Sequence, residues 1–218
     1  MTNGTLSVKE LILVPSIITI AVTLLRLVGE LKRWNENLFR RSPGGAGALV
    51  GITWLAIIFA IYIALRLRKT GQVFESKGKS IGLGALALVL FVAGTFLTVN
   101  PGEKLRLSAG FLVVVAALYV MRLAWPAYWN AMMAYALAAR IPVIIIMYLA
   151  MQGNWGTHYD AAPPSGVYQS LTAKFLALGL IPQVFFWIPF TVILCGLLGT
   201  IAAAIGKLPD RVDVGSAG

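Results

Sequence analysis

The sequence predicts an all-α integral membrane protein, a polytopic bundle of about six transmembrane helices within a single domain, residues 1–206. Of its 218 residues, 59% are hydrophobic and 12% are charged, whereas soluble domains are about half apolar and about a quarter charged. The mean hydropathy is +0.83. Charged side chains are too few to cover a water-exposed surface, and apolar runs recur at the length of about 20 residues that a bilayer requires.

The first predicted span covers residues 10–30 and ends with Arg26 and Glu30, which lie four positions apart and therefore on one helix face. The two side chains either reach the membrane surface and pair weakly there, or Arg26 faces the bundle and contributes to a polar path. The basic connection 31–48 follows. Its apolar residues recur at helical spacing, which predicts a segment lying flat on the membrane surface.

Three further spans are predicted at residues 49–65, 81–99 and 105–123. Glycines in the second of these permit close contact between helices. The Asn-Pro-Gly sequence at residues 100–102 predicts a tight turn. Residues 125–129 contain two tryptophans and a tyrosine, a composition typical of the aromatic belt at a membrane interface.

The fifth predicted span, residues 130–152, contains Arg140 close to its centre. A charge at that depth costs about 2.5 to 3.5 kcal/mol on insertion scales, so such a residue normally faces the protein interior or a wet cavity. Pro142 removes one backbone hydrogen bond and leaves the carbonyl of Ala138 without its donor. The guanidinium could therefore have a structural role beside that carbonyl or a role in a polar path.

Residues 168–181 have apolar side chains at helical spacing and predict a short interfacial helix before the last span, residues 183–205. The division is placed at Pro182, although the sequence leaves open whether 171–205 is one long helix or two segments. The polar residues 207–218 predict a disordered C-terminal tail.

Six spans place both chain ends on one side of the membrane. The connections on that side carry a small majority of the basic residues, which favours an orientation with both termini inside. The loop at residues 153–170 contains no Lys or Arg, which favours the outer face for it. The connections before and after the second span are both basic, so the two favour opposite orientations of the protein.

The net charge of +10 is carried by residues at the ends of apolar runs. This placement indicates a bilayer with acidic lipids as the partner, together with a candidate protein partner in the membrane, and no nucleic acid. One cysteine, Cys195, and one histidine, His158, allow neither an internal disulfide nor a Cys/His metal cluster. No metal site is predicted, and the sequence identifies no cofactor.

The loop after the fifth span places an aromatic surface, a base, a phenol and a carboxylate within six positions, at Trp155, His158, Tyr159 and Asp160. A neutral imidazole suits acid–base work near pH 7, and Asp160 lies close enough in sequence to point the same way. Alternatively, Asp160 and Thr157 satisfy backbone donors and simply stabilise the loop. No catalytic residue is assigned. The candidate residues for binding a ligand or partner are Arg26, Glu30, Arg140, Trp155, His158, Tyr159 and Asp160.

Three functions from different classes remain open. The small size and the scarcity of acids inside the membrane favour a non-catalytic subunit or an assembly or interaction protein of a larger complex. The alternative is a small transporter or channel-like protein for a small anionic solute, with Arg140 in the pathway. A third is a membrane-embedded enzyme that acts on a lipid through His158 and Asp160. A polar cavity that reaches Arg140 would favour transport, whereas Arg140 packed against carbonyls with no cavity would favour a subunit.

Overall fold

The structure is a computed structural model and describes residues 6–45, 48–99, 104–164 and 166–206. Its regular structure over these ranges is entirely helical, which confirms the predicted all-α bundle. The α-helices are α1 (Val8–Leu31), α2 (Thr53–Lys69), α3 (Lys77–Val99), α4 (Lys104–Ala124), α5 (Pro126–Gly153), α6 (Leu171–Phe175), α7 (Ile188–Phe190) and α8 (Gly196–Ile205). The π-helical segments η2 (Leu176–Leu180), η3 (Gln183–Trp187) and η4 (Thr191–Cys195) lie between α6 and α8, and a short turn, η1 (Pro43–Gly45), precedes α2.

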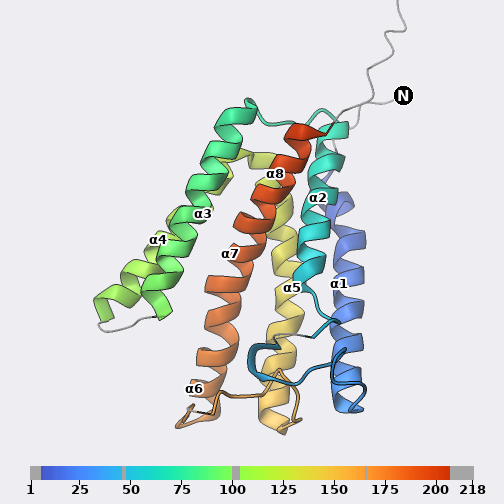
Figure 1. Cartoon of the computed structure of the whole chain (residues 1–218), viewed down its shortest axis with the longest axis vertical. Helices are drawn as coiled ribbons and strands as arrows, with labels where there is room; N and C mark the ends of the chain where they lie inside the picture. Colours follow the sequence, from blue (N-terminus) through green and yellow to red (C-terminus); the bar gives the residue numbers. More distant parts are fainter. Residues whose placement is uncertain (1–5, 46–47, 100–103, 165, 207–218) are drawn as a thin grey trace, which may run out of the picture.

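Five helices in the described ranges are long and apolar enough to cross a membrane, which supports a multi-pass membrane protein. They are Val8–Leu31, Lys77–Thr98, Leu105–Ala124, Pro126–Gly153 and Leu171–Ile205. The second predicted span, residues 49–65, corresponds to α2, which has 17 residues and is therefore about 25 Å long at about 1.5 Å per residue. Figure 1 shows α2 running alongside α1, α5 and α8 within the bundle.

The connection after α1 does not form the surface helix that its spacing predicts. Arg33 has a positive φ of 54°, and its backbone N–H donates to the carbonyl of Glu30 at 3.1 Å. The next N–H, of Trp34, donates to the carbonyl of Gly29 at 2.9 Å. This pair of bonds is a Schellman motif, which ends a helix. Apart from η1, the described residues between Leu31 and Thr53 are therefore turns and loop, and Glu30 is held in the last turn of α1.

Residues 171–205 form one continuous helical run, here called the last helix, with no break at Pro182. The predicted division into an interfacial helix and a span is therefore not seen as an interruption of the backbone. Proline lacks the N–H that an α-turn requires. Both Pro182 and Pro189 lie between π-helical turns, whose hydrogen bonds run from residue i to i+5 instead. Most of the apolar stretch of the last helix is buried, so it is the central element of the bundle.

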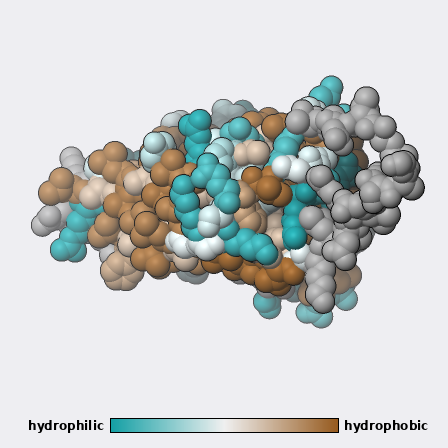
Figure 2. All heavy atoms as spheres, turned by 90° about the horizontal axis from the view of Figure 1, so that it is seen from above, coloured by the Kyte–Doolittle hydropathy of each residue, from teal (hydrophilic) through white to brown (hydrophobic). Residues whose placement is uncertain are grey.

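Helices α3 and α4 form an antiparallel pair whose lower ends project away from the other helices (Figure 1). Their backbones approach closely where a Cβ added to Gly94 would lie 2.9 Å from the carbonyl oxygen of Gly110. Small residues permit this kind of contact between membrane helices. Figure 2, a view from the end, shows hydrophobic residues over most of the part of the molecule where this pair lies.

Two of the aromatic residues at 125–129, for which an interfacial belt was predicted, lie inside the bundle and not on its surface. Trp125 and Tyr128 are fully buried. The indole N–H of Trp125 donates to the carbonyl of Gln72 at 3.1 Å, and the Tyr128 hydroxyl donates to the carbonyl of Ala60 at 2.9 Å. These bonds satisfy the polar atoms of large side chains in the core. Cys195 is buried as predicted.

The loop between α1 and α2 and the loop between α5 and α6 lie at the same end of the bundle (Figure 1). The predicted turn at residues 100–102 and the predicted tail at residues 207–218 lie outside the described residues. The shared end of the bundle is where the predicted site residues of α1 meet those of the loop after α5.

Candidate functional site

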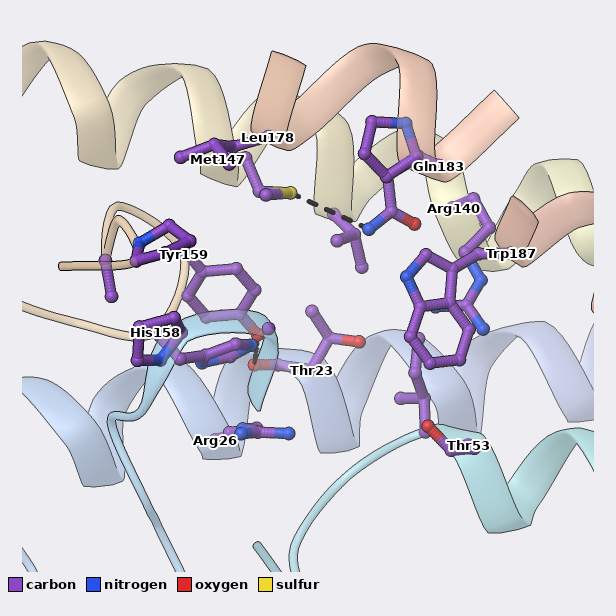
Figure 3. Close-up of a pocket in the computed structure, with 17 residues that line it drawn as sticks. Thr23, Arg26, Thr53, Arg140, Met147, His158, Tyr159, Leu178, Gln183 and Trp187 are labelled. Carbon is purple, nitrogen blue, oxygen red and sulfur yellow. Dashed lines mark hydrogen bonds between the residues drawn. The ribbon is translucent and has the colours of Figure 1, made fainter. Parts of the chain in front are cut away.

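A cavity of about 390 Å³ lies between α1, α5 and the last helix, close to the end that carries the two loops (Figure 3). Pro43 and Gly44 contribute to its wall from the first loop, and His158 and Tyr159 contribute from the second. Binding sites for small molecules have volumes of about 300 to 1,000 Å³, so the cavity is large enough for a small organic ligand.

Arg140 lies at one end of the cavity, inside the bundle as its central position in α5 predicts, and is only 4% exposed. Its guanidinium lies over the ring of Trp187 in the last helix, with its central carbon 4.8 Å from the ring centroid. Among the described residues, no ion pair or hydrogen bond holds the guanidinium, and its Nε is buried without a partner. The contact with the Ala138 carbonyl that Pro142 suggested is therefore not made.

Arg26 and Glu30 are also buried, so their side chains do not extend into solvent as an exposed pair would. The Arg26 Nε donates to Glu30 Oε1 at 2.8 Å, and a second guanidinium nitrogen donates to the carbonyl of Arg40 at 3.2 Å. Glu30 is 1% exposed. A buried carboxylate requires several donors, and the loop after α5 provides two more of them.

Both of these donors come from His158. Its backbone N–H donates to Glu30 Oε2 at 2.8 Å, and its Nδ1 lies 2.6 Å from Glu30 Oε1. The Glu30 carboxylate thus receives bonds on both oxygens from residues far apart in sequence. Burial lowers the pKa of His158, and Arg26 lowers it further, while the hydrogen bond to Glu30 opposes the shift. The imidazole is therefore neutral near pH 7, with Nδ1 donating and Nε2 as an acceptor.

Tyr159 anchors the same loop to α1. Its hydroxyl donates to the carbonyl of Thr23 at 3.3 Å, and its ring lies 3.8 Å from that of His158 between centroids. Burial raises the pKa of Tyr159, so the phenol stays protonated and continues to donate. Thr23 in turn lines the cavity between Arg26 and Arg140 (Figure 3).

Asp160 does not pair with His158, contrary to the orientation that their spacing allowed. Its carboxylate accepts from the backbone N–H of Gly156 at 2.9 Å and from the backbone N–H and hydroxyl of Thr157 at 2.7 Å each. These bonds form the loop-stabilising arrangement that was the alternative interpretation. Trp155 is partly exposed. Neither Asp160 nor Trp155 lines the cavity.

The structure therefore brings four of the seven candidates to the cavity wall, namely Arg26, Arg140, His158 and Tyr159, with Glu30 behind His158. The last helix also contributes to the wall, with Leu178, Pro182, Gln183 and Trp187. The Gln183 amide N–H lies 3.7 Å from the sulfur of Met147, and its buried Oε1 has no partner among the described residues. Gln183 was not among the residues selected from the sequence. The signal that could have indicated it is a single amide side chain directly after Pro182 in an otherwise apolar run.

Comparisons with protein-family models, curated proteins and solved structures found no match for this chain. The chemistry of the site follows from its charges. Arg26 and Glu30 cancel each other and His158 is neutral, so Arg140 gives the cavity one net positive charge. Across the described residues, no three His, Cys, Asp or Glu side chains gather where they could hold a metal ion. The arrangement suits a small anion with an apolar body.

Proposed function

We propose that this protein binds a small organic anion in the cavity and carries it across the membrane. The observation that supports this most directly is the Arg140 guanidinium, which lines the cavity and has no carboxylate partner among the described residues. Arginine suits a planar anion because its N–H groups can bond both oxygens of a carboxylate at once. The ligand would supply the missing counter-charge.

The energetic cost of Arg140 supports a functional role for it. A guanidinium near the centre of a membrane helix costs about 2.5 to 3.5 kcal/mol. Its contact with Trp187 offsets part of this, since a desolvated cation over an indole is worth about 2 kcal/mol. Intramembrane charges of this kind normally mark a ligand or ion pathway.

The remaining walls indicate the rest of the ligand. Val143, Met147 and Leu178 are apolar and line the space between Arg140 and the loop end. Arg140 and Met147 lie two turns apart on α5, which corresponds to about 10 Å along the helix. A carboxylate attached to an aromatic ring or a short chain would pair with Arg140 and place its apolar part along this wall.

The alternatives have less support in this geometry. A non-catalytic subunit, which the sequence favoured, does not require a cavity beside Arg140. An enzyme that uses Asp160 is not supported, because both oxygens of that carboxylate accept bonds within the loop. With both chain ends inside, as the basic residues favour, the end of the bundle that carries His158 would face outward and the cavity would be loaded from outside.

Binding is tested with phenylpropanoate and the purified protein in detergent, followed by tryptophan fluorescence. We expect Arg140→Met to weaken binding about thirty-fold or more, because loss of one partner of a buried charge pair costs about 2 kcal/mol or more. The control is Arg122→Met. Arg122 also lies over a tryptophan, with its guanidinium carbon 5.6 Å from the ring of Trp129, but it is exposed.

Uptake of the labelled anion into proteoliposomes then separates a carrier from a receptor. Arg140→Met should remain folded, because it removes a buried charge without exposing a partner. Equal binding by Arg140→Met and the unchanged protein would refute the proposal. The proposal would also be refuted if the unchanged protein bound none of the three anions phenylpropanoate, benzoate and hexanoate. A stoichiometric protein partner in a preparation that binds no anion would favour the subunit instead.

A further inference from the structure

His158 lines the cavity, and one of its two ring nitrogens is held by Glu30. Its Nδ1 lies 2.6 Å from Glu30 Oε1, and its backbone N–H is fixed to the other carboxylate oxygen. The Nε2 has no hydrogen bond to any described residue. The side chain lines the cavity and is 13% exposed. A neutral imidazole held in this way presents the Nε2 lone pair as an acceptor for a proton from the cavity.

Glu30 is less suited to accept that proton. Its two oxygens already receive bonds from Arg26 and from the backbone N–H and the Nδ1 of His158. Hydrogen bonds that favour the charged carboxylate keep it ionised. His158 is therefore the group in this cluster that can change its charge near neutral pH.

The charged groups around His158 come from α1, from its own loop and from α5. Helix α1 contributes Arg26 and Glu30. The loop itself contributes the uncharged Tyr159 and the carboxylate of Asp160, and the charge of that carboxylate favours the protonated imidazole. The connection after α1 contributes the carbonyl of Arg40, which accepts a bond from Arg26. Helix α5 contributes Arg140 at the other end of the cavity, while the last helix presents the uncharged Gln183 and Trp187.

We propose that His158 takes up one proton on Nε2 when the anion binds, so that the protein carries a proton together with its anionic ligand. This inference rests on the proposed function. The negative charge of the ligand stabilises the imidazolium and, by reciprocity, the proton strengthens binding of the anion. The proton comes from water on the loading side and is released with the ligand. On loading, an O–H bond of hydronium breaks and the Nε2–H bond forms, leaving water, and on release the N–H bond breaks and the proton returns to water.

Charge balance supports the coupling. The empty cavity carries the single positive charge of Arg140. A monoanion and a proton together add no net charge, so the loaded and empty sites carry the same charge. A cargo without net charge crosses independently of the membrane potential, which otherwise acts on every elementary charge that is moved.

The first test is calorimetry of phenylpropanoate binding in two buffers that differ in heat of ionisation, which measures the protons taken up. We expect about one proton per anion at pH values above the pKa of His158, and an affinity that falls about tenfold per pH unit there. His158→Gln keeps an N–H group that can bond Glu30. It should bind the anion with no proton uptake and little dependence on pH.

The second test uses the unchanged protein, so it does not depend on a variant that folds. His158 is the only histidine of the chain, so ¹⁵N-histidine labelling gives a single imidazole to follow by NMR. Addition of phenylpropanoate should move its titration to higher pH. Anion binding without proton uptake, or proton uptake that persists in His158→Gln, would overturn this inference and leave the proposed function intact. No anion binding at any pH would overturn both.

Discussion

Replacement of Glu30 by Gln should destabilise the folded protein strongly, because it removes the carboxylate that pairs with the buried Arg26. Glu30 is 1% exposed and accepts bonds from Arg26 and His158. Removal of one member of a buried ion pair costs about 3 to 5 kcal/mol. For a chain of this size, about 2 to 4 °C of Tm corresponds to 1 kcal/mol. The expected loss is therefore roughly 6 to 20 °C.

The assay is thermal unfolding in detergent, followed by circular dichroism. Two further variants make it specific. Glu36→Gln breaks the ion pair between Glu36 and Arg41, in which the Glu36 side chain is 77% exposed. This variant should lose less than about 1 kcal/mol of folding stability. The double variant Arg26→Met/Glu30→Gln removes both buried charges and should be more stable than Glu30→Gln alone. The reasoning is refuted if Glu30→Gln unfolds within about 2 °C of the unchanged protein, or if the double variant loses the sum of the two single losses.

Two further outcomes are expected. Gly199→Ala should lower stability by about 1 to 3 kcal/mol, since the added Cβ would clash with the Tyr128 hydroxyl and lie 2.8 Å from the carbonyl of Ala60. Gly82→Ala, which meets nothing within 4 Å, should be neutral or gain up to about 1 kcal/mol of helix propensity. Equal Tm values for these two variants would contradict the packing of the last helix against α2 and α5. The pKa of His158 is lowered on folding, so the unfolded chain binds more protons, and stability should fall as pH drops through about 6.5, the ordinary imidazole value. His158→Gln should flatten this part of the Tm–pH curve, and an unchanged slope would argue against a buried neutral imidazole.

The membrane helices could be predicted because their signal is local. Composition and the length of each apolar run determine that the backbone must be helical, since lipid offers no other partner for its N–H and C=O groups. The predicted spans therefore lie close to the observed helices, for example 105–123 against Lys104–Ala124. The surface helix after α1 was wrong because the positive φ of Arg33, which ends the helix, has no glycine or asparagine to indicate it.

The site was only half predictable. Arg140 and His158 were singled out because a charge in an apolar run and a sole histidine are visible in one sequence. The partner of His158 could not be found in that way. Asp160 is the nearer carboxylate in the chain, whereas the observed partner, Glu30, is 128 residues away. Only the packing of α1 against the loop after α5 brings the two together, and no spacing rule describes such a contact.

The alternation of π and α turns in the last helix has a mechanical consequence. A π turn contains one residue more than an α turn, and one residue corresponds to about 100° of rotation about the helix axis. Conversion of η3 to α geometry would thus rotate the segments on its two sides relative to each other by that angle. The indole of Trp187, at the end of η3, would then move away from the Arg140 guanidinium that lies over it. The hydrogen-bond pattern of the last helix thus determines whether an aromatic ring lies against Arg140.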